Sequence, residues 1–286
     1  MNSVQSLWNC PSCQTELTLQ GKTWSCENKH SFDMAKEGYV NLLLAHHKNS
    51  KEPGDNKDMV NARRAFLEQG HYQPLAEKLG QLFSEYCRTL ENNNEINFFD
   101  AGCGEGYYMH VISQLAQSAE FCCAYSGIDI SKNAVLKAAK KYKNNQFAVA
   151  STYHLPLQND SQNAVLQIFA PSSEQEILRV LKSNGVWLTV NPAANHLHQL
   201  KQALYDSPTE HKDNSNVPAG FTLQKQINLS FDVSLTTQAA RENLLMMTPY
   251  YWSATEQKKQ QLIQQLQLVT TDFDIRIYQK VSPLQS

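Results

Sequence analysis

A glycine-rich stretch near the middle of the chain, NFFDAGCGEGYYMHVISQL at residues 97–115, constrains the fold more than any other feature. Apolar residues run up to Asp100, three glycines follow at alternate positions, and apolar residues then recur at helical spacing after Tyr107. A strand, a glycine turn and a helix start together form a ligand crevice at the carboxyl edge of a parallel sheet. Glycine suits such a turn because a side chain would keep the backbone away from the ligand. The stretch therefore predicts an α/β domain with a ligand site at this turn.

The spacing of Gly102, Gly104 and Gly106 distinguishes between classes of ligand. A dinucleotide-binding turn has its third glycine one residue later, where this chain has Tyr107, and the Gly-Lys-Ser/Thr end of a P-loop does not occur. Asp100 stands two residues before the first glycine, where an acid repels pyrophosphate but suits a cationic or hydrogen-bond-donating ligand. This D-x-G-x-G-x-G arrangement resembles motif I of the class I S-adenosylmethionine-dependent methyltransferases.

Strands and helices alternate after the glycine turn. Asp129 ends the second predicted strand, where an acid would hold a ribose diol as a bidentate acceptor. Further strands are predicted at 145–151, 163–171, 186–191, 223–233 and 272–280, with helices at 132–142, 174–182, 236–247 and 255–266. This alternation predicts a doubly wound, mainly parallel, Rossmann-like sheet of the class I methyltransferase type, with seven strands, the last of them antiparallel. A Rossmann-type domain with another ligand, or with none, is the alternative.

A second constraint lies near the start of the chain, in CPSCQTELTLQGKTWSCENKH at residues 10–30. Cys10 and Cys13 form one close pair and Cys26 and His30 another, with twelve residues between the pairs. Three thiolates and an imidazole at this spacing suit a tetrahedral zinc ion and leave no position open, so we expect one structural zinc. Metal binding would supply most of the folding free energy of so small a module. The alternatives are a catalytic zinc, or buried cysteines beside a surface histidine.

The chain of 286 residues can hold a small module and one full-sized domain. We divide it into a zinc-binding module over 1–40, a helical connection over 41–95 that contributes to the ligand cleft, and a methyltransferase domain over 96–286. No apolar run of about 18 residues occurs, and the first ten residues lack the basic and apolar regions of a secretory signal. We therefore expect a cytoplasmic protein without membrane contacts, whose other cysteines are reduced.

The chain as a whole resembles the bacterial 23S rRNA (guanine-N1)-methyltransferases, which bind zinc and use S-adenosylmethionine. The likeness extends beyond the glycine turn and the cysteine cluster to stretches spread over nearly the whole chain. These are FDMAKEGYVNLL at 32–43, ARRAFLEQGHYQPL at 62–75, HLPL at 154–157, FAP at 169–171, NHL at 195–197 and MTPYYW at 247–252.

The resemblance implies roles for individual residues. It makes Cys10, Cys13, Cys26 and His30 the zinc ligands. The residues that it assigns to cofactor binding are Tyr72, Asp100, Gly102, Gly104, Glu105, Gly106, Asp129 and His196. Spacing alone would favour a core aromatic at Tyr72 and a helix-start histidine at His196. The resemblance instead favours cofactor binding by both residues.

The function that the resemblance implies is transfer of a methyl group from S-adenosylmethionine to N1 of a specific guanine in a hairpin of 23S rRNA. The N-terminal module would recognise the RNA, and the target guanine must be unpaired or flipped because N1 lies on the Watson–Crick edge. The N1 proton must also leave, and the sequence does not identify the group that takes it. Topology places Asp100, Glu105, His154 and His196 in the crevice.

The net charge of −2 does not by itself favour a nucleic-acid partner. RNA binding would need a local patch, for which the sequence offers His46, His47, Lys48, Lys51, Lys57, Arg63 and Arg64. The alternatives are a methyltransferase of a small molecule or protein whose zinc module serves dimerisation, and a non-enzymatic zinc RNA-binding adaptor. The sequence leaves open which guanine is methylated, whether the chain forms a homodimer, and what the loop at 206–219 and the Gln-rich helix near the C-terminus do.

Overall fold

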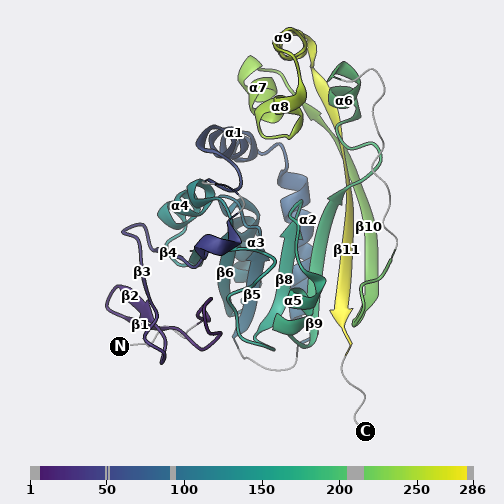
Figure 1. Cartoon of the computed structure of the whole chain (residues 1–286). Helices are drawn as coiled ribbons and strands as arrows, with labels where there is room; N and C mark the ends of the chain where they lie inside the picture. Colours follow the sequence, from purple (N-terminus) through teal and green to yellow (C-terminus); the bar gives the residue numbers. More distant parts are fainter. Residues whose placement is uncertain (1–6, 49, 51, 91–94, 205–215, 282–286) are drawn as a thin grey trace.

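The computed structural model in Figure 1 describes residues 7–48, 50, 52–90, 95–204 and 216–281. Lys51 and most of the loop predicted at 206–219 lie outside the described residues. One large sheet runs through the molecule with helices packed against it, and a small three-stranded sheet lies at the N-terminal end. No described helix is long and apolar enough to cross a membrane.

The large sheet has eight strands in the order β10-β11-β9-β8-β5-β6-β7-β4. They are β4 (Tyr39–Asn41), β5 (Ile96–Ala101), β6 (Cys123–Asp129), β7 (Gln146–Val149), β8 (Gln162–Ile168), β9 (Leu181–Pro192), β10 (Phe221–Ser234) and β11 (Leu268–Lys280). The strands from β4 to β9 pair in parallel, whereas β11 is antiparallel to both β9 and β10. The predicted fold class is confirmed, and β4 adds an eighth strand at the β7 edge that the sequence did not indicate.

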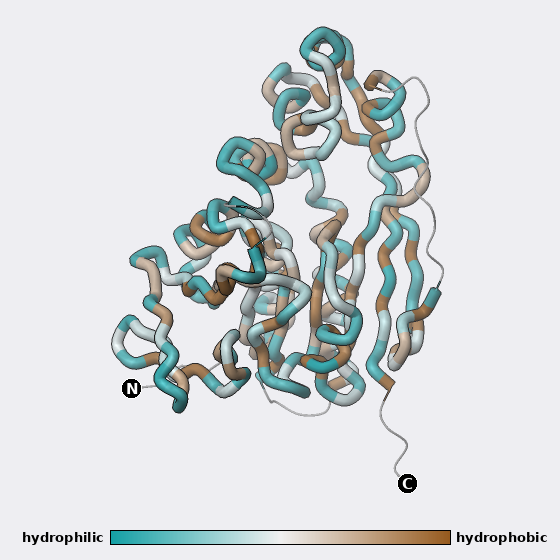
Figure 2. Tube along the Cα trace, viewed as in Figure 1, coloured by the Kyte–Doolittle hydropathy of each residue, from teal (hydrophilic) through white to brown (hydrophobic). Residues whose placement is uncertain are grey.

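Helices pack on both faces of this sheet, and the N-terminal module packs on one of them. The helices are α1 (Lys57–Glu68), α2 (Gln73–Cys87), α3 (Tyr107–Ser118), α4 (Lys132–Lys141), α5 (Glu174–Val180), α6 (His198–Leu204), α7 (Gln238–Met246), α8 (Tyr250–Ser253) and α9 (Glu256–Gln265), with a short 3-10 turn η1 at Ala45–His47. Phe98 and Leu166 pack on one face with residues of α2, α3 and α4. Phe99 and Val165 pack on the other face with α5 and the N-terminal module. Burial on both faces explains why apolar residues occur on both sides of the central strands, as the brown segments in Figure 2 show.

The N-terminal module is docked on the domain of its own chain. Its strands β1 (Thr18–Gln20), β2 (Thr23–Ser25) and β3 (Ser31–Asp33) form an antiparallel sheet. Trp8 and Trp24 are buried in the same apolar cluster as Phe99, and the backbone N–H of Asn9 donates to the carbonyl of Pro156 at 2.9 Å. Strand β4 then joins the large sheet across the boundary set at residue 40. A cut at that boundary would remove Tyr39 and Val40 from the sheet.

Candidate functional site

A cavity of about 620 Å³ lies at the carboxyl ends of β5, β6, β8 and β9. The glycine turn after β5 lines it, together with residues from α1, the start of α2 and the segment between α7 and α8. The chain runs from β5 to β6 and β7 on one side and to β8 and β9 on the other, so the strand order reverses at β5. Open α/β sheets bind their ligands at this switch point.

Asp129, the last residue of β6, organises the glycine turn. Its Oδ2 accepts a hydrogen bond from the backbone N–H of Gly104 at 3.0 Å, and its Oδ1 accepts one from the N–H of Ser131 at 2.7 Å. Gly104 has a φ of +55°, and a Cβ built there would meet nothing within 4 Å. A Cβ on Gly102 would lie only 2.4 Å from the Cβ of Ala170. The turn is therefore tightly packed at Gly102 and open toward the cavity at Gly104.

Two further carboxylates are buried in the cavity wall, with Asp100 exposed by 3% and Glu105 by 2%. Burial, reinforced by the charge of Asp129, raises the pKa of Asp100 to about 8. Burial raises the pKa of Glu105 to about 7, although the charges of Lys141 and Arg64 oppose that rise. Neither carboxylate oxygen of Glu105 has a hydrogen-bond partner among the described residues, and Nε of Arg64 lies 4.0 Å away. Buried acceptors of this kind suit a ligand that donates hydrogen bonds or carries positive charge.

Part of the cavity wall is aromatic. Tyr72 is buried and stands edge-on to Phe273, with ring centroids 5.3 Å apart. His196 contacts the same phenylalanine at a centroid distance of 4.8 Å, and its Nδ1 accepts a hydrogen bond from the backbone N–H of Asp272 at 3.2 Å. Because Nδ1 is an acceptor, the neutral imidazole carries its proton on Nε2. This part of the wall thus offers aromatic ring faces beside the buried acids.

The structure gathers all but one of the residues assigned to cofactor binding. Those lining the cavity are Tyr72, Asp100, Gly102, Gly104, Glu105, Asp129 and His196. Gly106 does not line it: a Cβ there would lie 2.9 Å from the ring of Tyr142, so packing explains this glycine. The placement of His154 in the crevice is wrong, because His154 stacks on His47 with ring centroids 4.5 Å apart and lies outside the cavity lining.

Several cavity residues were not identified from the sequence. Arg63, which we placed in an RNA-binding patch, forms an ion pair with Asp55 and donates from Nη2 to the carbonyl of Met247 at 3.3 Å. Phe169 and Tyr250 also line the cavity. Both lie in stretches quoted above, FAP and MTPYYW, but neither stretch carries an acid or a histidine that would have pointed to chemistry.

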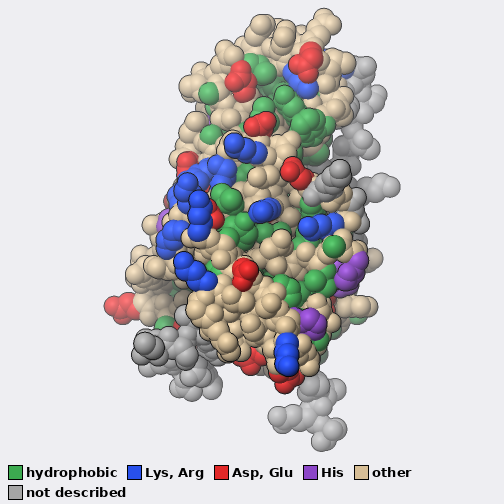
Figure 3. Space-filling model, turned by 60° about the vertical axis from the view of Figure 1, so that its left-hand side comes forward, with side chains coloured by type: hydrophobic (Ala, Val, Ile, Leu, Met, Phe, Trp, Pro, Cys, Tyr) green, Lys and Arg blue, Asp and Glu red, His purple; other side chains and the backbone are tan. Residues whose placement is uncertain are grey.

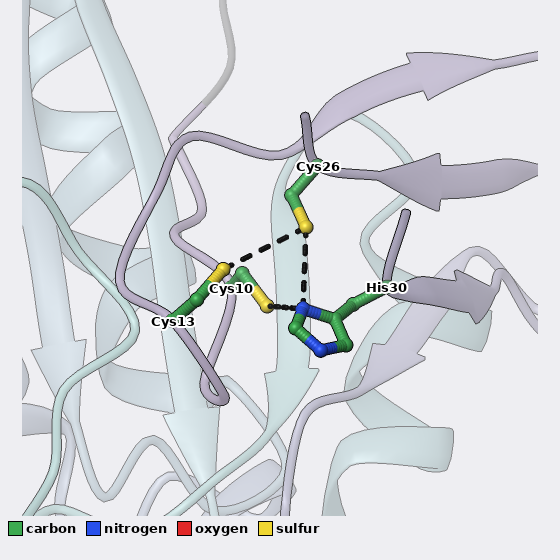
Figure 4. Close-up of side chains that lie close together, drawn as sticks. All are labelled: Cys10, Cys13, Cys26 and His30. Atoms are coloured by element: carbon green, nitrogen blue, oxygen red, sulfur yellow. Dashed lines mark hydrogen bonds between the residues drawn. The ribbon is translucent and has the colours of Figure 1, made fainter. Parts of the chain in front are cut away.

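The two cysteine-containing pairs converge at one point in the N-terminal module (Figure 4). The four ligand atoms of Cys10, Cys13, Cys26 and His30 all lie within 4.8 Å of one another. Sγ of Cys26 is 3.7 Å from Sγ of Cys13 and 3.4 Å from Nδ1 of His30. Tetrahedral zinc bound to sulfur and nitrogen requires ligand separations of about 3.5 to 3.8 Å. The donor set and its spacing therefore fit one four-coordinate zinc ion.

Family models match both parts of the chain. Residues 8–51 match the model of the RlmA N-terminal zinc ribbon, and residues 92–233 match a methyltransferase domain. The cofactor of the catalytic domain is S-adenosylmethionine, and the ribbon is a structural zinc module. The chain is accordingly an enzyme, which excludes the non-enzymatic adaptor considered above.

One relative extends these matches over nearly the whole chain, and another over about two thirds of it. YxjB of Bacillus subtilis (strain 168), provisionally assigned as a 23S rRNA (guanine-N1)-methyltransferase, is 31% identical over 284 residues, which cover 96% of this chain and 98% of YxjB. The 23S rRNA (guanine(748)-N1)-methyltransferase of Streptomyces fradiae is 36% identical over 196 residues, covering 68% of this chain and 66% of that enzyme. Because the likeness to YxjB includes both the ribbon and the cavity, this chain belongs to the family of 23S rRNA (guanine-N1)-methyltransferases.

Proposed function

We propose that this enzyme methylates N1 of a guanine in a hairpin of 23S rRNA, with S-adenosylmethionine as the methyl donor. The observation that carries the proposal is a cavity whose wall holds both buried acids and aromatic rings around one glycine turn. The buried acids suit the donor groups of the cofactor, and the exposed ring of Phe169 suits a flat base. The cofactor and the guanine can then meet at the glycine turn. Ribosomal RNA as substrate would place the enzyme in the cytoplasm.

The chain's own residues would hold the cofactor beside the buried acids. Bound S-adenosylmethionine supplies an electrophilic methyl group on a positively charged sulfur. Gly104 lets the backbone come close to the ligand, while Asp100 and Glu105 offer buried acceptors to its ammonium or hydroxyl groups. Both oxygens of Asp129 already accept backbone hydrogen bonds, so Asp129 would hold a ribose hydroxyl through a remaining lone pair while it fixes the turn.

Helix α4 supplies the basic surface that an RNA substrate needs. Its lysines and the one that follows it are Lys132, Lys137, Lys140, Lys141 and Lys143. Lys141 pairs with Glu68 at 2.6 Å and Lys143 donates to the carbonyl of Glu37 at 3.0 Å, which ties α4 to α1 and to the N-terminal module. The other three form no hydrogen bond or ion pair with a described residue. Figure 3 shows Lys and Arg side chains gathered on one face of the molecule, which supports an RNA-binding surface despite the negative net charge.

Replacing Lys132, Lys137 and Lys140 together by glutamine should weaken hairpin binding and make it less dependent on salt. Each lysine that neutralises a phosphate adds about 0.7 to 0.9 to the slope of log affinity against log salt, so the slope should fall by about 2. Titrations at several salt concentrations measure this. The matched control is Lys225→Gln, because Lys225 already pairs with Glu85 at 2.9 Å. An unchanged slope in the triple variant would show that RNA does not lie along α4.

The affinity for S-adenosylmethionine should rise with pH between about pH 6 and about pH 8.5. The cofactor's donor groups favour the ionised carboxylates, whereas the pKa values of Asp100 and Glu105 are raised to about 8 and about 7, so binding at lower pH must release protons. Each group can contribute up to about tenfold per pH unit below its pKa. Calorimetry in two buffers of different ionisation enthalpy counts these protons, and Glu105→Gln should remove the lower step. A flat profile would contradict the assignment of both acids.

The proposed function is tested on RNA. Purified enzyme with S-adenosylmethionine should methylate hairpin transcripts of 23S rRNA, and mass spectrometry of nuclease fragments should locate the product as 1-methylguanosine at one position. Methylation of a small molecule or protein instead, with no RNA product, would support the alternative in which the ribbon serves dimerisation. The ribbon is docked on the domain of its own chain, and Lys143, just after α4, donates to the carbonyl of Glu37. This places the N-terminal module next to the proposed basic surface and favours the RNA function.

A further inference from the structure

We infer that the exposed ring of Phe169 is the platform on which the flipped guanine stacks. This inference rests on the proposed function and adds the residue that receives the base. Phe169 follows β8, on the opposite side of the glycine turn from Asp129. It lines the cavity. Asp100 and Glu105 belong to β5 and the turn that follows it, so the ring after β8 is left for the methyl acceptor.

The backbone at Phe169 is strained. Among the described residues, the apolar ones with positive φ are Phe169 and Leu197, both at +53°, and both line the cavity. A side chain in the left-handed region costs about 1 to 3 kcal/mol and persists only where neighbouring contacts determine it. Leu197 is exposed by only 2%, so burial of its side chain offsets the cost. Phe169 is exposed by 44%, so burial does not explain its conformation.

Hydrogen bonds around Phe169 hold the strained turn in place. Its backbone N–H donates to the carbonyl of Val190 at 3.1 Å. The side-chain amide of Gln167 donates to the carbonyl of Ala170, and its Oε1 accepts from Nε1 of Trp187 at 3.1 Å. Ala170 packs directly against Gly102, so the position of the Phe169 ring is coupled to the cofactor turn. The turn is thus rigid although the ring at its tip is exposed.

The ring is supported on one side and open on the other. His196 and Phe273 each lie 5.8 Å from its centroid, and they contact each other at 4.8 Å, so the three rings form one cluster. The other large apolar residues that are exposed, such as Tyr153 and Trp252, do not line the cavity. A rigid, half-exposed aromatic ring inside a ligand cavity matches the way proteins hold unstacked bases. A flat base is therefore the ligand that this feature fits.

Substitutions of Phe169 test the inference in the full-length enzyme. Phe169→Leu keeps an apolar side chain but removes the ring, and should lower kcat/KM for the hairpin by about 10- to 100-fold. Phe169→Tyr keeps the ring face and should remain within about threefold of the original enzyme. Calorimetry should show unchanged affinity of Phe169→Leu for S-adenosylmethionine. The matched control is Tyr153→Leu, which removes an exposed ring outside the cavity and should leave kcat/KM unchanged.

A binding measurement separates stacking from general damage to the fold. The hairpin is compared with one that carries an abasic site in place of the methylated guanine. The original enzyme should bind the guanine hairpin more tightly, and Phe169→Leu should lose most of that preference. Equal preference in both proteins, or a parallel loss of cofactor affinity, would overturn the inference while leaving the proposed function intact. No methylation of any 23S rRNA hairpin by the original enzyme would overturn both.

Discussion

Replacing Cys13 by serine is expected to release zinc from the N-terminal ribbon and to unfold it. Cys13 supplies one of four ligand atoms that lie within 4.8 Å of one another, and serine is a poor ligand for zinc at this position. Metal binding contributes about 10 to 16 kcal/mol to the folding of small zinc modules, so the ribbon should not survive its loss. Metal analysis should give about one zinc per chain for the original protein and almost none for the variant.

The same variant should still bind S-adenosylmethionine, because no residue that lines the cavity belongs to the ribbon. Its methylation of the rRNA hairpin should be lost, since the ribbon borders the basic helix α4. Cys122→Ser is the control, because Cys122 is exposed and outside the cluster. Full zinc content in Cys13→Ser would refute the ligand assignment. Full methylation by a zinc-free protein would refute the role of the ribbon in RNA recognition.

Gly104→Val should lower the affinity for S-adenosylmethionine by at least about 100-fold, because its side chain would occupy space that the cofactor needs. The structure makes this effect specific to the ligand. A Cβ at Gly104 meets nothing within 4 Å, so the added atoms do not collide with the protein and instead enter the cavity. Calorimetry with purified, folded variant measures the loss.

Backbone strain must be separated from this steric effect, and the chain offers a matched glycine. Gly21 has a φ of +65°, close to the +55° of Gly104, and a Cβ there also meets nothing within 4 Å. Gly21 lies between β1 and β2 in the ribbon and does not line the cavity. Gly21→Val should therefore carry comparable strain and leave cofactor affinity unchanged. If folded Gly104→Val retained its affinity for S-adenosylmethionine, the cofactor would not bind at the glycine turn.

The proposed RNA-binding surface depends on which charges the fold leaves without a partner. Arg63 and Arg64 were expected to meet phosphates, but Arg63 pairs with Asp55, and Arg64 pairs with Glu68 at 2.9 Å. The lysines of α4 that have no such partner were read only as part of an amphipathic helix. Some basic side chains form ion pairs with acids that are distant in sequence, and others do not. Only the tertiary structure therefore shows which cations on a surface can meet phosphates.

The sequence by itself determined the fold class, the zinc cluster and the glycine turn, because each depends on short-range spacing. Apolar periodicity sets strands and helices, and the Cys10–Cys13 and Cys26–His30 pairs each place two ligands within one tight turn. Only the tertiary structure decided that Gly106 serves packing against Tyr142, that His154 stands outside the cavity, and that β4 extends the sheet. It also decided that Phe169 has a strained backbone, with a φ of +53°, and a side chain that is 44% exposed. These features depend on contacts between segments far apart in the chain, and local spacing carries no information about which distant side chain will fill a given space.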